Sequence, residues 1–136
     1  MDETQRLSTL LGDIYDAALD PALWPAVLEA AAGFVVGVAS ALFMKDSVRK
    51  THNTVFTWGY DADFTRTYIE KYVRLDPFTT GQFFFDIGEP VCGADLMTYE
   101  EHRRTQFYVE WVQPQGWADV VAVTLEKSAT TYSGFS

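Results

Sequence analysis

The sequence predicts an α+β fold in which an antiparallel sheet carries helices on both faces. Two observations support this prediction. Several segments repeat apolar residues at the 3.6-residue spacing of amphipathic helices, and two pairs of short apolar segments are separated by polar turns, as in β-hairpins. Because hairpins join antiparallel neighbours and a parallel sheet needs crossover connections, the helices are expected to pack on an antiparallel sheet.

Length and composition indicate one globular domain spanning residues 1–136. The 136 residues include 48% hydrophobic and 21% charged ones, which is typical of a folded chain with its own core. Aromatic residues make up 15%, which predicts a large core, an aromatic-lined pocket, or both. The formal net charge of -9 would repel phosphate backbones, so no direct nucleic-acid binding by this chain is expected.

Cysteine content and the apolar segments predict a cytoplasmic protein. Cys92 is the single cysteine, so the chain forms no intramolecular disulfide, which fits a reducing compartment. Acidic residues interrupt the N-terminal apolar residues, so the N-terminus is not a signal peptide. The longest apolar region, AVLEAAAGFVVGVASALFM, contains Glu29 and is interpreted as a buried helix followed by a strand, with no membrane partner.

The first half of the chain predicts three helices and a hairpin. A first helix covers about 7–18 and ends before Pro21, and a second begins at Trp24 or Pro25 and ends near Ala32. Strands are expected at 38–46 and 51–59. A third helix, capped by Asp61, should extend over about 62–75, because the following Asp-Pro disfavours further helix.

The second half predicts one more helix and a second hairpin. Residues 82–87 fit either a helical turn or a short strand, and the Gly- and Pro-containing stretch that follows is expected to be irregular. Thr98 with Glu101 forms a capping-box pattern that starts a helix lasting to about Trp111 or Val112. The last two predicted elements are strands at 117–127 and 129–136. The chain stops soon after the last strand begins, so it is interpreted as a piece of a longer protein or a shortened form.

No pattern of catalytic or metal-binding residues stands out. His52, His102 and Cys92 lie far apart in different predicted elements, which argues against a zinc site, and no metal or cofactor is expected. The chain has no phosphate-binding loop of Gly, Lys and Ser or Thr. A Ser-His-Asp triad is not excluded by residue order, but no nucleophile sits in a Gly-flanked turn.

Aromatic residues provide the best candidate site. Phe64, Tyr68 and Tyr72 are spaced by four and predict one face of the third helix, with Asp76 close behind. The simpler interpretation makes the aromatics core and Asp76 a turn residue; the other makes them the wall of a pocket, since a carboxylate in an apolar cavity needs a partner. Phe107 and Trp111 share a face of the fourth helix and would close the opposite side.

Two motifs resemble a known family. The stretch FTRTYIEKYVRLDPF is similar to the aromatic-x3-Tyr…Asp-Pro signature of the autoinducer-binding domains of LuxR-type transcription regulators. The order of LLGDIYDAALDPALWPAVLEAAAGFV, YVRLDPF and FYVEWVQPQGWAD resembles the N-terminal region of LuxR-type helix-turn-helix regulators, over about 10–125. This resemblance implies a cytoplasmic sensor domain, an α-β-α sandwich akin to PAS and GAF folds, with a small organic ligand between sheet and helices.

The resemblance also implies roles for individual residues. In the family the matching Tyr and Asp hydrogen-bond the ligand and the preceding aromatic lines its site. Carried over by position, the resemblance points to Phe64, Tyr68 and Asp76. Together with four further aromatic residues, Tyr72, Trp58, Trp111 and Phe107, these are the predicted ligand-binding residues. We therefore expect a non-catalytic sensor that forms homodimers, without the helix-turn-helix of the family. The alternatives are a small isomerase-like enzyme using a pocket Asp and Tyr, and a pure dimerisation or interaction module.

Overall fold

The computed structural model describes residues 2–136 and confirms the α+β class with an antiparallel sheet. The described chain forms two compact units. The first contains residues 2–41 with Val55–Tyr60, and the second contains Leu42–Thr54 with Asp61–Ser136. Every predicted ligand-binding residue except Trp58 belongs to the second unit.

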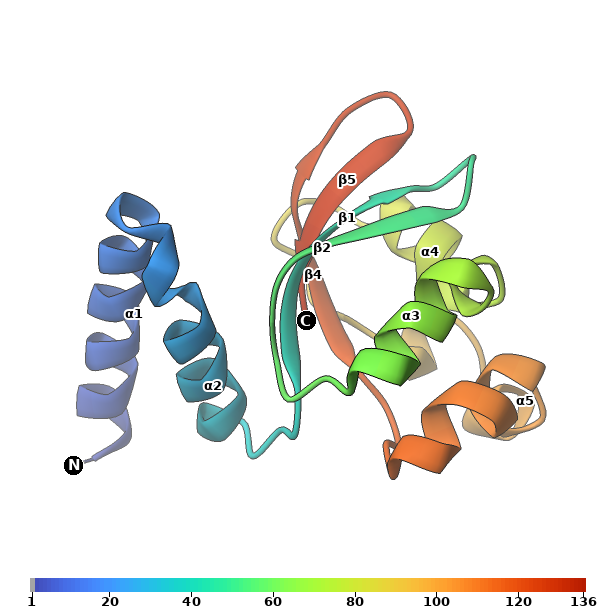
Figure 1. The fold of residues 1–136 in the computed structure, drawn as a ribbon, viewed down its shortest axis with the longest axis horizontal. Coiled ribbons are helices and arrows are strands. Elements are labelled where there is room, and N and C mark those ends of the chain that lie inside the picture. The colour runs from blue at the N-terminus through green and yellow to red at the C-terminus, as the bar shows by residue number, and fades with distance from the viewer. Residues whose placement is uncertain (1) are drawn as a thin grey trace. The chain divides into compact units, whose positions relative to one another are not determined.

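The first unit is built on two antiparallel helices, α1 (Glu3–Leu19) and α2 (Trp24–Phe34) (Figure 1). Asp2 caps α1: its side chain accepts a hydrogen bond from the Gln5 backbone N–H at 2.8 Å, while the Gln5 side chain accepts one from the Asp2 N–H at 3.1 Å. Pro21 begins a short 3₁₀ turn directly after α1, as predicted. The two predicted N-terminal helices are thus confirmed.

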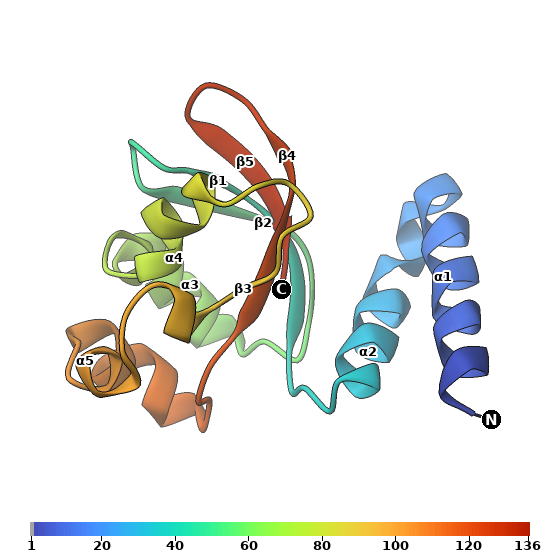
Figure 2. The ribbon, with the colours of Figure 1, turned by 180° about the vertical axis from the view of Figure 1, so that it is seen from behind.

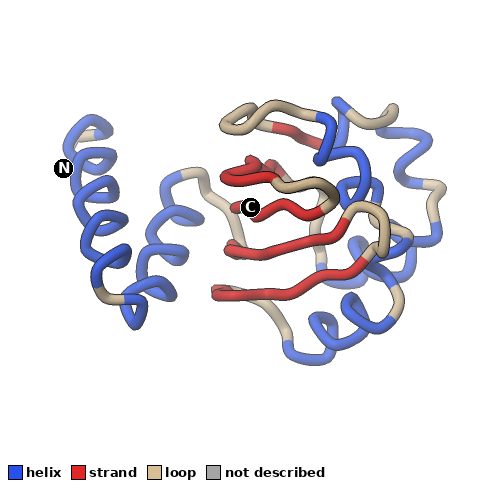
Figure 3. The backbone as a smooth tube through the Cα atoms, turned by 90° about the horizontal axis from the view of Figure 1, so that it is seen from above, coloured by secondary structure: helices blue, strands red, loops and turns tan. Residues whose placement is uncertain are grey.

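Within residues 2–136, five strands form one sheet. They are β1 (Ser40–Asp46), β2 (Thr51–Trp58), β3 (Val91–Cys92), β4 (Val121–Lys127) and β5 (Thr131–Phe135). Hydrogen bonds join them in the order β2-β1-β5-β4-β3, and Figure 3 shows them side by side. Both predicted hairpins are confirmed. The short strand β3, which lies beside β4 in Figure 2, falls in a stretch that was expected to be irregular.

The helices of the second unit lie on one face of this sheet (Figure 1). They are α3 (Ala62–Glu70), α4 (Pro77–Gly81), α5 (Tyr99–Arg103) and a π-helix at Tyr108–Val112, and Gln82–Phe84 forms a 3₁₀ turn after α4. Helical cover on the other face of the sheet stays a prediction.

The third predicted helix is shorter than expected. It ends at Glu70 rather than near Leu75, because Lys71 leaves the helical conformation at φ -134° and a 3₁₀ turn, Tyr72–Arg74, follows. Asp76 is extended before Pro77, whose ring disfavours helical backbone in the preceding residue. The chain therefore unwinds between α3 and α4.

The fourth predicted helix is interrupted. Thr98 caps α5 as expected, accepting a hydrogen bond from the Glu101 N–H at 3.2 Å, but α5 ends at Arg103. The Thr105 hydroxyl then donates to the His102 carbonyl at 2.7 Å and accepts from the Tyr108 N–H at 3.2 Å. Such local side-chain bonds compete with the helical ladder, so the single helix expected to last to Trp111 or Val112 is wrong.

Gly134 allows close packing at the centre of the sheet. It lies on β5, where an added Cβ would come within 2.6 Å of Phe43 Cζ and 2.9 Å of Phe43 Cε2. Phe43 is buried and its ring has little room to move. We expect Gly134→Ala to lower the free energy of unfolding by about 1–3 kcal/mol, measured by urea denaturation.

A matched glycine provides the control for this prediction. Gly33 lies in α2 and an added Cβ there meets nothing within 4 Å. Because Ala favours helix over Gly, Gly33→Ala should be neutral or stabilising by up to about 1 kcal/mol. Equal stability of Gly134→Ala and the wild-type protein would contradict the packing at β5.

Candidate ligand-binding site

Three side chains of the second unit form a hydrogen-bonded group, here called the polar cluster: Lys45, Tyr68 and Asp76. The Tyr68 hydroxyl donates to Asp76 Oδ2 at 2.5 Å and accepts from Lys45 Nζ at 2.5 Å. Lys45 Nζ also lies 3.2 Å from Asp76 Oδ2, and these two side chains are only 5% and 9% exposed. The cluster therefore joins β1, α3 and the start of α4.

Each member of the polar cluster is placed by its own element. Side chains alternate between the faces of a strand, so Lys45 points to the same face as the buried Phe43. Tyr68 is the buried residue of α3. Asp76 is the N-cap of α4, because its Oδ1 accepts a hydrogen bond from the Phe78 N–H at 2.8 Å.

Burial keeps the Tyr68 hydroxyl of the cluster protonated. Loss of contact with water raises the pKa of Tyr68 well above its usual value, and the charge of Asp76 beside it raises that pKa further. The Tyr68 hydroxyl therefore stays protonated and acts as a donor to Asp76. An unpaired charge at this depth would be costly, so Lys45 and Asp76 depend on one another.

Two stacked aromatic rings, Phe107 and Trp111, stand beside the cluster and are here called the aromatic wall. Their centroids are 5.4 Å apart with 14° between the planes, and the Trp111 ring lies 4.8 Å from the Tyr68 ring. The Trp111 indole N–H donates to the Phe64 carbonyl at 2.8 Å, which ties the wall to α3. Trp111 belongs to the π-helix, a form that occurs frequently at functional sites.

His52 of β2 is another aromatic neighbour of Tyr68. Its ring meets the Tyr68 ring edge to face at 4.9 Å and stacks on Phe43 at 5.6 Å. His52 Nε2 lies 2.6 Å from the Thr54 hydroxyl, and its buried Nδ1 has no partner among the described residues. Burial, and then the charge of Lys45, lower the pKa of His52 to about 3, so the ring is neutral.

This depressed pKa makes stability depend on pH. Below about pH 6.5 the unfolded chain takes up a proton at His52 that the folded chain, with a pKa of about 3, does not. The free energy of unfolding should therefore fall as the pH falls from about 6.5 towards 3. In His52→Phe, urea denaturation at about pH 7 and pH 5 should show a smaller loss than in the wild-type protein. Equal losses in the two proteins would rule out a neutral buried His52.

The structure brings together four of the predicted side chains in the second unit. Tyr68, Asp76, Phe107 and Trp111 form a contiguous set, and Phe64 joins it through its backbone carbonyl. The remaining two predicted residues, Tyr72 and Trp58, make none of these contacts.

Tyr72 lies beyond the end of α3, so the prediction that it shares one helix face with Phe64 and Tyr68 is wrong. Its hydroxyl donates to Glu110 Oε1 at 2.8 Å. Trp58 ends β2 in the first unit.

Lys45 and His52 are the members of the site that sequence reasoning missed. The sequence contains one signal for them. In SALFMKD, Lys45 is two residues from Phe43 and so lies on the same face of the strand; His52 and Thr54 alternate in the same way on β2. A lysine on the inward face of a buried strand predicts a buried acidic partner.

Glu110 does not have the properties of a general acid. It accepts hydrogen bonds from Tyr72 and, at 3.3 Å, from Lys71 Nζ on the surface of the unit. The bond from Tyr72 lowers the pKa of Glu110, whereas an acid that acts near neutral pH needs a raised one. The isomerase-like alternative therefore gains no support from this residue.

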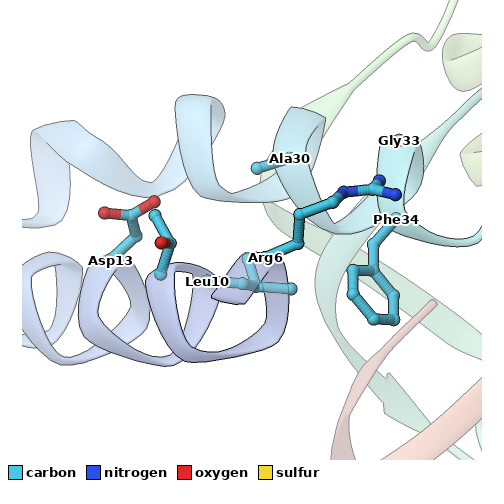
Figure 4. Close-up of a pocket in the computed structure, with 7 residues that line it drawn as sticks. Arg6, Leu10, Asp13, Ala30, Gly33 and Phe34 are labelled. Carbon is cyan, nitrogen blue, oxygen red and sulfur yellow. The ribbon is translucent and has the colours of Figure 1, made fainter. Parts of the chain in front are cut away.

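A separate groove of about 340 Å³ lies between α1 and α2 in the first unit (Figure 4). Leu10, Ala30 and Phe34 line it, with Asp13 further along α1. The Arg6 guanidinium already lies over the Phe34 ring, 5.3 Å from its centroid. None of the residues predicted to bind ligand lines this groove.

Residues 2–136 contain neither a helix that could span a membrane nor a cluster of metal-binding side chains. Within this part of the chain, no helix combines the length and the apolar character needed to cross a bilayer. The same residues contain no group of three or more His, Cys, Asp or Glu side chains arranged to hold a metal ion.

Comparison with known proteins identifies a similar fold. The crystal structure of the LBD domain of VqsR from Pseudomonas aeruginosa superposes with a TM-score of 0.73 over 97% of this chain and 76% of that one. The two sequences are 16% identical over this match, so the likeness concerns the fold alone. No protein-family model matches the chain, and no curated protein matches it.

Proposed function

We propose that this chain is the small-molecule-sensing regulatory domain of a LuxR-type transcription regulator and that it has no catalytic activity. The observation that carries the proposal is the contact between Tyr68 and Asp76 beside the aromatic wall. These are the two polar positions that the family resemblance assigns to ligand binding. The likeness of the fold to the VqsR LBD domain supports the same class of domain.

The proposed ligand lies between the sheet and the helices of the second unit. Aromatic rings are suited to cover an apolar or aryl ligand, and the polar cluster is suited to orient it. Trp111 and Phe107 are each 5% exposed, so their rings lie in the interior of the second unit. The proposed contacts with the ligand include those that the family resemblance implies for Phe64, Tyr68 and Asp76.

Binding has a predictable energetic consequence. A ligand that binds the folded chain and not the unfolded one stabilises it by about 2.7 kcal/mol at a hundredfold excess over the dissociation constant. In the proposed mechanism the ligand stabilises the second unit and biases a homodimer towards one arrangement. Because this chain has a net charge of -9, we assign DNA binding to another part of the regulator. We propose that the regulator acts in the cytoplasm.

An exposed apolar surface on α1 supports the proposed homodimer. Leu7, Leu11, Tyr15 and Leu19 are exposed at intervals of four along α1. Residues four apart lie on the same face of a helix, so these side chains form an apolar stripe. Sedimentation velocity of the intact chain tests this part of the proposal, which a monomer at all concentrations contradicts.

Thermal unfolding against a library of acyl and aryl compounds tests the sensing function. We expect at least one compound to raise the melting temperature of the wild-type chain. Its effect should be reduced in Tyr68→Phe, which removes the hydroxyl between Lys45 and Asp76, and retained in Tyr72→Phe, which removes a surface hydroxyl bound to Glu110. A library without a stabilising compound would contradict a sensing role.

A further inference from the structure

Lys45 gives the polar cluster a donor that the family resemblance does not supply. Its ammonium group has three N–H bonds. Two of them are directed at the Tyr68 hydroxyl at 2.5 Å and at Asp76 Oδ2 at 3.2 Å. Among the described residues, no oxygen or nitrogen atom accepts a hydrogen bond from the third, although the Lys45 side chain is only 5% exposed. The nearest aromatic groups are the Phe43 and Tyr68 rings, whose centroids lie 5.3 Å and 5.2 Å from Lys45 Nζ.

Tyr68 cannot serve as that donor while the cluster is intact. A tyrosine has one O–H bond, and Tyr68 directs it to Asp76 Oδ2 at 2.5 Å. Donation to a ligand would break this short bond to a carboxylate, which belongs to the stronger class of hydrogen bonds. The hydroxyl oxygen already accepts from Lys45.

Asp76 is nearly saturated with donors from its own chain. Its Oδ1 accepts from the Phe78 N–H at 2.8 Å, and its Oδ2 accepts from both Tyr68 and Lys45. These bonds fill three of the roughly four acceptor positions of a carboxylate. The cluster therefore has little need of a donor from a ligand.

We infer that Lys45 is the specificity-determining residue of the proposed sensor and that its third N–H binds the carbonyl oxygen of an uncharged ligand. This inference rests on the proposed function and names the class of ligand. An acceptor oxygen is the group that completes the hydrogen bonding of Lys45. Neighbouring apolar atoms of the ligand meet Tyr68 and, beyond it, Trp111.

Charge explains why the ligand is uncharged. Asp76 already compensates Lys45, and the neutral His52 ring adds no positive charge. A ligand carboxylate would therefore bring an uncompensated negative charge into a buried site, at a large cost in solvation. A ketone or ester oxygen takes the same hydrogen bond without that cost.

Three matched probes test the inference on the intact chain: 4-phenylbutan-2-one, 4-phenylbutanoate and butylbenzene. They share a phenyl ring and a four-carbon chain and differ in whether the chain carries a ketone, a carboxylate or no acceptor. Hydrogen bonds to charged groups contribute about 1.5–3 kcal/mol, so NMR titration should show the ketone binding about tenfold or more tightly than the hydrocarbon, and also more tightly than the carboxylate.

Variants of two lysines test whether the tighter binding of the ketone depends on Lys45. In Lys45→Met, which keeps the length of the side chain without the donor, the ketone and the hydrocarbon should bind within about twofold of one another. Lys50→Met, at an exposed position of the turn after β1, should keep the wild-type ranking. If Lys45→Met does not fold, the ranking in the wild-type chain and the movement of the Lys45 ammonium signal on adding the ketone decide the question.

The outcomes separate this inference from the proposed function. Equal binding of ketone and hydrocarbon, or preference for the carboxylate, overturns the role of Lys45 even if library compounds stabilise the chain. Library hits with no binding of any of the three probes overturn it as well. If neither the probes nor any library compound binds, the inference and the sensing function both fall.

Discussion

Replacing Asp76 with Asn is expected to lower the free energy of unfolding by about 3 kcal/mol or more. The substitution keeps the shape of the side chain and an oxygen for the cap on α4, but it removes the charge that lies 3.2 Å from Lys45 Nζ. An ammonium group whose side chain is 5% exposed then has no compensating anion beside it. Removing one partner of a buried ion pair is costly for this reason.

Urea denaturation of two further variants tests this explanation. Asp61→Asn changes the exposed N-cap of α3, where Asn and Asp are equally good, and should alter stability by less than about 0.5 kcal/mol. Lys45→Met combined with Asp76→Asn removes both charges and should recover more than half of the loss. If Asp76→Asn were no more destabilising than Asp61→Asn, the buried ion pair would not be stabilising the fold.

Trp111→Ala is expected to be the other large effect, at about 3–5 kcal/mol. Trp111 is 5% exposed, stacks on Phe107 at 5.4 Å and meets the edge of Trp117 at 5.3 Å. Its indole N–H also donates to the Phe64 carbonyl. Truncation to Ala leaves a cavity beside Tyr68 and a backbone carbonyl of α3 without this partner.

Trp111→Phe separates packing from hydrogen bonding at this position. It keeps an aromatic ring against Phe107 but lacks the indole donor, so it should cost clearly less than Trp111→Ala when both are measured by urea denaturation. A loss of less than about 1 kcal/mol in Trp111→Ala would mean that the aromatic wall is not a packed part of the second unit.

The elements that sequence reasoning predicted well are those set by local signals. The capping residues Asp61 and Thr98 and the proline after α1 mark helix ends through short-range bonds, and they were found where expected. The shortened α3 and the π-helix were not predictable in this way. They depend on the backbone conformation at Lys71 and on the hydrogen bond from the Thr105 hydroxyl. The helical spacing of apolar residues in the sequence continues through both breaks and so does not reveal them.

The residues of the candidate site also differ in how well local sequence signals predict their positions. Tyr68 and Asp76 are eight residues apart, on α3 and at the cap of α4, so a helix followed by Asp-Pro was enough to place them near one another. Lys45 is separated from Tyr68 by 23 positions in sequence. Its approach depends on the packing of α3 across β1. Strand alternation predicts only that Lys45 points inward, and not which acid it meets.

We propose that a small molecule binds beside the polar cluster and the aromatic wall. The most direct test is a two-dimensional nitrogen–proton NMR spectrum of the labelled chain, recorded with and without a compound that stabilises it. We expect the Trp111 indole signal to move, because its N–H lies at the wall and donates to Phe64, and the signal of Trp24 in the first unit to stay in place. Movement of Trp24 with an unchanged Trp111 would contradict this location for the site.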